Sequence, residues 1–502
     1  MRSYFDFMND FNKEEILEGL VSHGMFSEKL PPIFESHSFY EYCKNEMPKF
    51  NNTYKESNYI KYESMRHINV PRSFGIPNPM NYYKLCLFIS ENWELIKMHF
   101  KEKTELEVQK VSKIHIRKMK NSKKIFQMNY KNYQTDEFEQ IDYLLDSKYL
   151  VNVDISTCFP SIYTHSIPWA LVGKSSAKID RNPNFWFNQL DFYTRGINNG
   201  ETHGILIGPH ASNILSEIVL VSVDSELVEK GWKYTRNVDD YSCYVNSYEE
   251  SQNFLSDITN SLKKYNLILN HKKTAISKLP LCSTERWIRE LNMSPLGRDS
   301  YISYKTLKLS IDLALDLLQS NHENAAILNY LIKIIDQKEL SKNAEKYYVR
   351  NILHLSILYP YLIPLIDKYI FEKLKVKKEV IKNYSNIVFK EGQKSNNKEM
   401  MCFSIYFSIK YEFEVEDLTF ESIYETNHCI LYLLGFMYSK SVIKNNEDIK
   451  LYKKLAKELK KNKEDFEENW IFIYEVLTFG LLNSDWKILK QNNISFLKNF
   501  ST

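Results

Sequence analysis

The sequence predicts an α+β protein in which a region built around an antiparallel sheet is followed by an all-α C-terminal region. Short strand-like runs, turn signals and unusual polar residues are concentrated between residue 61 and about residue 300. From about residue 303 onward, apolar residues recur at helical spacing almost throughout. A chain of 502 residues is long for a single domain. We therefore expect an N-terminal helical extension, a mixed region and a C-terminal helical region, with the bounds 1–60, 61–300 and 301–502.

The composition excludes several classes of protein. With 43% apolar residues the chain can bury a sizeable core, and its net charge of +3 means that any affinity for polyanions depends on local clusters of charge. The seven cysteines are scattered without C-x-x-C spacing, which argues against a disulfide framework or a zinc module and is typical of a reducing compartment. The N-terminus MRSYFDFMNDFNKEE does not resemble a signal peptide, and no apolar run reaches the roughly 18–20 residues of a membrane span. We expect a cytoplasmic protein without a membrane partner.

The first element with chemical content is the stretch KYLVNVDIST, residues 148–157. Its β-branched and apolar residues predict a strand that ends at Asp154. The residues that follow, CFPSIYTHSIPWAL, contain Pro160 where a first helical turn tolerates proline. A carboxylate is therefore expected at a strand end.

A glycine loop comes next, within HGILIGPHASNILSEIVLVSVDSELVEKG, residues 203–231. Gly204 and Gly208 bracket a short apolar run, and Pro209 is expected to open a long amphipathic helix that ends near Gly231. Free backbone N–H groups at a helix start favour phosphate or sugar groups, so this loop is a candidate nucleotide contact.

The stretch KYTRNVDDYSCYV, residues 233–245, predicts a β-hairpin with Asp239 and Asp240 at its turn. Adjacent carboxylates repel each other, and burying such charge is costly unless it is compensated. Two strand ends with carboxylates can hold hard, oxygen-preferring cations, so we expect a site for two Mg²⁺, with Mn²⁺ as a substitute. Paired metals about 3.5–4 Å apart stabilise the attacking and leaving oxygens of an in-line phosphoryl transfer.

Two basic features accompany these carboxylates. Residues 253–276 predict an amphipathic helix that leads to a strand and to the pair Lys272 and Lys273. Residues 110–131 carry eight Lys or Arg and no acidic residue, which suits a triphosphate. In that stretch, Arg117 and Lys118 are the predicted phosphate contacts.

The last third of the sequence predicts apolar helices of hairpin size that cannot stand alone and form a stack similar to a solenoid, although no clean repeat is present. The polar stretch KEGQKSNNKE, residues 390–399, is predicted as a loop. The predicted helices are 306–319, 325–336, 351–374, 427–440 and 469–482.

The order and spacing of these motifs resemble the palm of a reverse transcriptase. Upstream, NVPRSFGIPNPMNYYKLCLFISENWELI, residues 69–96, resembles the N-terminal region of bacterial abortive-infection and defence-associated reverse transcriptases. In that group a HEAT-like helical domain follows the polymerase, and the helical last third of this sequence resembles such a domain. The resemblance implies a right-hand polymerase palm and fingers followed by an all-α HEAT-like domain. The three motifs are D-x-x-x-x-F from Asp154 to Phe159, Gly208-Pro209, and x-x-D-D from Asn237 to Asp240.

The resemblance also implies roles for individual residues. Asp154 and Asp239 would be the principal metal ligands, with Asp240 in support. The ring of Phe159 would clash with a ribose 2′-OH and favour deoxynucleotides. Gly208 would allow the backbone to approach the incoming nucleotide, and Lys273 resembles a lysine near the pyrophosphate leaving group.

Two positions depart from the pattern of the family. Asn237 stands where an aromatic or small residue is usual, and Ile207 stands where many reverse transcriptases carry Gln. That Gln normally reads the nucleotide sugar and template geometry, so its absence weakens the expectation of efficient templated copying. The metal chemistry is unaffected.

The function expected from the resemblance is RNA-directed DNA polymerisation in antiphage defence, with dNTPs, an RNA template or non-coding RNA, and a DNA product as partners. A homo-oligomer is expected from relatives. One alternative is a template-independent or protein-primed nucleotidyltransferase on the same palm. Another is a catalytically silent, RNA-binding scaffold. A nucleotide cyclase is disfavoured because the turn Gly-Gly-Asp/Glu-Glu/Asp-Phe is absent.

Overall fold

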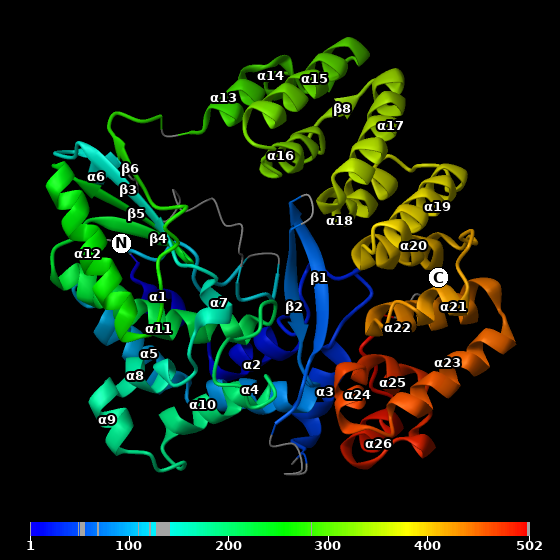
Figure 1. Ribbon diagram of the computed structural model, residues 1–502, viewed down its shortest axis with the longest axis horizontal. Coiled ribbons are helices and arrows are strands. Elements are labelled where there is room, and N and C mark those ends of the chain that lie inside the picture. Colours follow the sequence, from blue (N-terminus) through cyan, green and yellow to red (C-terminus); the bar gives the residue numbers. More distant parts are fainter. Residues whose placement is uncertain are drawn as a thin grey trace.

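The computed structural model describes residues 2–48, 50, 56–67, 70–108, 110–119, 122–126, 141–282 and 284–498. Figure 1 shows the elements arranged as an open ring. The central sheet lies on one side, the C-terminal helices pass over the top to the opposite side, and the last helices return to the N-terminal ones at the bottom. A long two-stranded ribbon stands in the middle of this ring.

The N-terminal part is helical apart from that ribbon, formed by β1 and β2 in antiparallel pairing. Side-chain caps fix several helix starts: Ser3 and Asn12 form capping boxes, and Asn78 accepts from two backbone N–H groups. The elements are α1 (Tyr4–Met8), α2 (Lys13–Val21), α3 (His37–Glu46), β1 (Ile60–His67), β2 (Val70–Ile76), α4 (Pro79–Glu91) and α5 (Trp93–Lys103).

The middle part contains a four-stranded sheet in the order β4-β5-β3-β6. Its three strand pairs are all antiparallel, and α12 packs against β3 and β5. The antiparallel sheet predicted for this region is therefore confirmed. The elements are α6 (Ile141–Leu144), β3 (Tyr149–Asp154), α7 (Cys158–Ser161), α8 (Ser166–Val172), α9 (Lys174–Ile179), α10 (Trp186–Gly196), α11 (His210–Glu229), β4 (Tyr234–Asn237), β5 (Asp240–Val245), α12 (Tyr248–Lys264) and β6 (Ala275–Lys278).

Helix α11 differs from the amphipathic helix that was predicted. Most of its side chains are buried, because α5, α8 and α12 all pack against it. The buried residues include the charged Glu217 and Asp224. In an amphipathic helix, such charged residues would lie on the face exposed to solvent. Such a helix is hydrophobic on nearly all sides and belongs to the interior.

The C-terminal part is helical, as predicted, apart from a short parallel strand pair. Its elements are α13 (Arg286–Met293), α14 (Pro295–Arg298), β7 (Tyr301–Ile302), α15 (Tyr304–Ser320), α16 (Ala326–Ile335), β8 (Glu339–Leu340), α17 (Lys342–Leu358), η2 (Pro360–Leu362), α18 (Ile363–Ile366), η3 (Asp367–Glu372), α19 (Lys378–Lys394), α20 (Lys398–Tyr411), α21 (Phe420–Tyr424), α22 (Cys429–Tyr438), η4 (Ser439–Ile443), α23 (Asn446–Leu459), α24 (Lys463–Glu468), α25 (Trp470–Val476), η5 (Phe479–Leu481) and α26 (Ser484–Gln491).

Three boundaries in this part differ from the prediction. The expected helix 351–374 is broken after Leu358, because Pro360 has no N–H to continue the hydrogen-bond ladder. The expected helix 469–482 ends at Val476. The expected loop 390–399 is mostly helix, since α19 continues to Lys394 and α20 begins at Lys398.

In the part of the chain that the structure describes, no helix combines the length and the apolar character that a membrane span requires.

Candidate active site at the end of the central sheet

The sheet brings the three predicted carboxylates together. In the pairing of β3 with β5, Asp154 lies opposite Asp240. In the pairing of β4 with β5, Asn237 lies opposite Asp240, so Val238 and Asp239 form a two-residue turn. The backbone N–H of Ile155 donates to the carbonyl of Asp239 at 3.1 Å and fixes the turn against the end of β3.

Two of these carboxyls, those of Asp239 and Asp240, have raised pKa values. Protein atoms crowd the carboxyl of Asp240, and this desolvation, with the charges of Asp239 and Asp154, raises its pKa to about 6. Desolvation also raises the pKa of Asp239, and the charge of Asp154 adds to that effect. The nearby cations therefore do not fully offset the desolvation and the carboxylate repulsion at Asp239 and Asp240.

Lys273 and Asn270 both contact Asp154, which is 5% exposed. The ammonium of Lys273 lies 2.5 Å from Asp154 Oδ2, and Asn270 Nδ2 donates to Asp154 Oδ1 at 3.0 Å. The backbone N–H of Asn270 donates to the Asp154 carbonyl at 2.7 Å. The ammonium of Lys273 thus places a positive charge next to the carboxylate cluster.

The donor set suits a hard divalent cation, although the residues described contain no ready-made group of three or more His, Cys, Asp or Glu placed as a metal site. Carboxylate oxygens are the ligands that Mg²⁺ prefers. Asp239 and Asp240 have raised pKa values, chiefly because of desolvation and neighbouring carboxylates, and the charge of Lys273 offsets these shifts only in part. The ammonium of Lys273 on Asp154 already shows that a cation is accommodated here.

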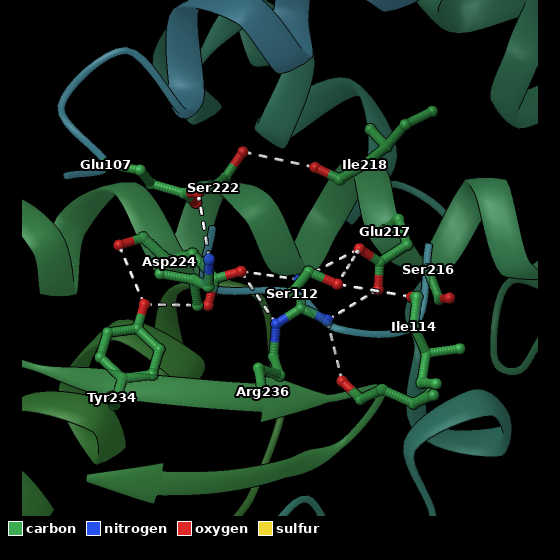
Figure 2. Close-up of polar contacts among 12 residues, drawn as sticks. Glu107, Ser112, Ile114, Ser216, Glu217, Ile218, Ser222, Asp224, Tyr234 and Arg236 are labelled. Carbon is green, nitrogen blue, oxygen red and sulfur yellow. Dashed lines mark hydrogen bonds and ion pairs between the residues drawn. The ribbon is translucent and has the colours of Figure 1, made fainter. Parts of the chain in front are cut away.

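Behind the hairpin lies a buried ion-pair network centred on Arg236 of β4 (Figure 2). The guanidinium is 0% exposed and contacts two carboxylates of α11. Its Nη1 lies 2.7 Å from Glu217 Oε1, and its Nε lies 2.8 Å from Asp224 Oδ2. Ser112 and Tyr234 complete the network by donating to Glu217 at 3.2 Å and to Asp224 at 3.0 Å.

Arg236 also holds the turn that presents the aspartates. Its Nη1 donates to the carbonyl of Val238 at 2.9 Å. Val238 has φ +60°, a left-handed conformation that a β-branched residue adopts only under strain. The buried network therefore stabilises a strained turn at the point where Asp239 and Asp240 leave the strand.

Phe159 lies on α7, directly beyond the end of β3, and is half-buried against the core. Its carbonyl accepts from Ile205 N at 3.0 Å, which joins α7 to the glycine loop. In that loop Gly204 has φ +87°, and a Cβ there would stand 3.1 Å from the Pro160 carbonyl. The loop thus packs against α7 because Gly204 has no side chain.

Gly208 requires glycine for a related reason. Its φ of +121° is one that residues with side chains rarely adopt, and a Cβ would meet Phe74 and Ser27 at 3.4 Å. The adjacent Ile207 accepts from Gly75 N at 2.9 Å, so the loop is bonded to β2.

The start of α11 does not offer free N–H groups as was expected. The N–H of His210 donates to the Gly24 carbonyl at 2.8 Å, and the N–H of Ala211 donates to Tyr82 Oη at 3.4 Å. Protein acceptors therefore occupy two donors that a phosphate would have used.

Arg117 and Lys118 lie against the N-terminal helices. Arg117 is 5% exposed, and its Nη2 donates to the Lys113 carbonyl at 3.0 Å. Lys118 pairs with Glu15 of α2 at 2.5 Å. None of these contacts reaches the carboxylate cluster.

A different arginine, Arg72 of β2, acts on Asp239. Its charge lowers the pKa of the Asp239 carboxyl, whereas desolvation raises it.

The sequence reasoning missed Arg236, Asn270 and Arg72. Arg236 lies two residues after the buried Tyr234 and therefore on the same face of β4, so a charge on this inward face was a signal of a buried partner. Asn270 and Arg72 offered no comparable signal, because their contacts join segments far apart in the sequence.

Residues 92–304 match the model of the family described as reverse transcriptase (RNA-dependent DNA polymerase). The match covers under half of the chain, and it contains β3, the β4–β5 hairpin and all three carboxylates. These residues are similar to a reverse transcriptase domain. The family generally uses divalent metal ions, a nucleic acid template and dNTP substrates.

Two solved structures of apo telomerase from Candida tropicalis are similar to the chain at low identity. The one truncated from the C-terminal domain has a TM-score of 0.30 and 13% identity, with 50% of this chain and 57% of that chain covered. The other has a TM-score of 0.33 and 10% identity, with 86% and 75% covered. Similarity at this level does not establish a shared fold. No curated protein matches the chain.

Proposed function

We propose that the chain is an RNA-directed DNA polymerase whose catalytic carboxylates are Asp154, Asp239 and Asp240. The observation that carries this proposal is the pairing of Asp154 with Asp240 across β3 and β5, with Asp239 at the adjoining turn. The family match supports the reaction, and the three neighbouring carboxylates, two of them with raised pKa values, support a binding site for two Mg²⁺ or Mn²⁺.

The bound cations would neutralise the carboxylates and stabilise the negative charge of the phosphoryl group in transfer. The protein residues have separate tasks. Asn270 and the backbone hold Asp154 in place, and Arg236 holds the hairpin turn. Lys273 lies beside Asp154, where its ammonium can donate charge or a proton to the pyrophosphate that leaves.

Two further residues are proposed to contact the incoming dNTP. Phe159, on α7 just beyond the end of β3, would exclude a ribose 2′-OH by its bulk. Gly208 would let the loop backbone approach the nucleotide. For the triphosphate we propose Arg72, because its charge already acts on Asp239, in place of Arg117 and Lys118, whose described contacts lie elsewhere.

The biological setting that we propose is antiphage defence in the cytoplasm, as in abortive-infection reverse transcriptases. Its support is the resemblance of residues 69–96 and the long helical part that follows the polymerase domain. We propose the divisions 1–60, 61–300 and 301–502, a HEAT-like organisation of the last of these, and a homo-oligomer.

Primer extension tests the polymerase. With an RNA template, a DNA primer, four dNTPs and Mg²⁺, the purified chain should extend the primer, and Asp239→Asn should lose at least about 10³-fold in rate. The matched control is Asp312→Asn on α15, an exposed aspartate outside the site, which should retain the rate. Equal activity of the Asp239→Asn and parent chains would contradict the proposal.

A template-independent polymerase on the same palm is favoured by one observation: Ile207 has no side-chain hydrogen-bonding group where many reverse transcriptases carry Gln. Extension without RNA, with equal use of all four dNTPs, would support this alternative.

Sequencing the nucleic acid that co-purifies after protease treatment would show a bound RNA and any DNA attached to a side chain. If Asp239→Asn retained phage protection, an RNA-binding scaffold would explain the function better than a polymerase.

A further inference from the structure

A cavity of about 920 Å³ lies between α2, α3, α4 and α10. Figure 1 shows these helices at the bottom of the molecule and the central sheet above them. None of the three catalytic carboxylates lines the cavity, so it is separate from the polymerase site. Its volume lies within the range of small-molecule sites, about 300–1,000 Å³.

Aromatic side chains form much of the cavity wall. Phe50 and Tyr83 contact each other edge to face, with centroids 5.7 Å apart. On the facing helix α10, Phe192 is 39% exposed, and Tyr193 follows it. Nucleobases stack on such rings, and because every base has an aromatic face, the interaction is tolerant of sequence.

Charged groups surround these rings. Lys13, Lys44 and Lys84 line the cavity together with Glu14 and Glu91, which leaves one net positive charge. Among the described residues, none of the five takes part in a salt bridge.

Lys84 is the most informative of these groups, because it is half-buried and no carboxylate of the described residues contacts it. Burial lowers the pKa of its ammonium, and Asp485 offsets this only in part. An ammonium held at the edge of an aromatic cavity favours an anionic ligand.

Asn81 lies in the wall and is held there by hydrogen bonds of its own. Its Nδ2 donates to Ser57 Oγ at 2.9 Å and to the Gly196 carbonyl at 3.0 Å, which fixes the orientation of the amide. Within the described chain its Oδ1 accepts no hydrogen bond.

We propose that this cavity binds a nucleoside phosphate, with the base against Phe192 and the phosphate at Lys84. The rings suit the base, and the ammonium of Lys84, which forms no salt bridge with the described residues, suits the phosphate. A purely apolar ligand would leave the ammonium of Lys84 without a partner. The same chemistry is offered by a free nucleotide and by one nucleotide of a single-stranded RNA, so the test must separate the two.

Direct binding measurements test the proposal without relying on polymerase activity. Full-length protein carrying Asp239→Asn is titrated in EDTA with ATP, and separately with a 5′-phosphorylated single-stranded RNA, by calorimetry. In this background, Phe192→Ala and Lys84→Gln should each weaken binding about tenfold, the size expected for loss of one stacking or phosphate contact. Their matched controls are Phe479→Ala and Lys382→Gln, an exposed ring and a half-buried lysine outside the cavity, which should leave both affinities unchanged.

The pattern of losses identifies the ligand. Weaker binding of ATP in both cavity variants assigns a free-nucleotide site. Weaker binding of the RNA alone assigns a site for one nucleotide of a strand. Unchanged affinity for both ligands in both cavity variants, with circular dichroism showing that the variants are folded, overturns the proposal. If the parent chain failed to extend a primer, the measured affinities for ATP and RNA would still test the cavity. The cavity proposal and the polymerase proposal can therefore be contradicted independently of each other.

Discussion

The carboxyl of Asp240 has a raised pKa that bears on the stability of the metal-free protein. Its pKa of about 6 lies above the ordinary value for an aspartate, because protein atoms and two neighbouring carboxylates disfavour its charge. A raised carboxyl pKa contributes stability at low pH, and this contribution is lost as the pH rises through about 6. At pH 8 the ionised carboxyl of Asp240 is thus expected to make the metal-free protein less stable than it would be with this carboxyl neutral.

Asp240→Asn should therefore raise the thermal midpoint by a few degrees in EDTA at pH 8. At pH 5 the parent carboxyl is already protonated, so the two midpoints should converge. Differential scanning calorimetry across pH 5–8 measures the difference. A gain in stability that is the same at every pH would show that the replacement acts by packing and not by removing charge.

Phe159 is the residue on which sugar selection is expected to depend. Replacing it with alanine opens the space beside α7 while leaving the backbone bond between Phe159 and Ile205 intact. The ratio of kcat/KM for dCTP to that for CTP should fall about 10–100-fold, which is the discrimination that a steric contact of this size provides. Phe159→Tyr, which keeps the ring, should retain the ratio. If alanine leaves the ratio unchanged, Phe159 is a packing residue.

At the scale of elements, the β4–β5 hairpin depends on the buried network behind it. Arg236, with 0% of its side chain exposed, compensates two carboxylates and bonds to the strained turn. Arg236→Met leaves Glu217 and Asp224 buried without their cation, so unfolding should become easier by about 3–5 kcal/mol. Urea unfolding followed by circular dichroism measures this loss.

The control for that replacement is the exposed ion pair between Lys230 and Asp257, at 2.6 Å. Lys230→Met should change stability by less than about 1 kcal/mol, because solvent screens a pair on the surface. Similar effects of the two replacements would mean that Arg236 stabilises the hairpin no more than a surface charge does.

The local elements around the site were predictable from the sequence, and the contacts between them were not. Alternation and turn chemistry indicated β3 and the hairpin, and the order of the motifs indicated that Asp154 and Asp239 belong together. The partners of Arg236 could not be predicted from the sequence, because they lie on α11 and on the segment near Ser112. The fold brings both of these alongside β4. Position in three dimensions decides such pairings.

The helical part shows the same limit in another form. Apolar periodicity runs through the break after Leu358, so the pattern predicted one helix where Pro360 makes two. The stretch 390–399 looked like a loop by polarity, yet Lys and Glu are good helix formers and both flanking helices extend into it. Periodicity reports which side of an element is buried and says little about where the element stops.

At the scale of the whole molecule, the C-terminal part closes the ring by contacting the start of the chain. Phe34 forms an isolated antiparallel bridge with Leu497, and the N–H of Glu35 donates to the Phe496 carbonyl at 3.0 Å. Phe496 is 0% exposed and packs edge to face on Trp470. The N-terminal helices and the last helices are thus joined by backbone bonds as well as by a shared apolar core.

A second contact joins α20 to the central ribbon through Glu399. This side chain is 1% exposed, and its Oε2 accepts from Met65 N of β1 at 2.8 Å. Burial raises its pKa to about 7, while hydrogen bonds from Ser64 and Met65 oppose the shift. Because the folded-state pKa exceeds the ordinary glutamate value, the stability that the neutral group contributes is present at low pH and is lost as the pH rises through about 7.

Glu399→Gln keeps an oxygen acceptor for Met65 N and removes the ionisation. Between pH 6 and 8 the parent chain should lose on the order of 1 kcal/mol relative to this variant, because one group titrating near pH 7 gives about 1.4 kcal/mol over that range. Thermal midpoints of both chains at pH 6, 7 and 8 measure the difference, with the exposed Glu379→Gln on α19 as the control that should follow the parent. Parallel pH profiles for the parent and Glu399→Gln chains would mean that the carboxyl is solvated enough to ionise freely, and that α20 holds the ribbon by packing alone.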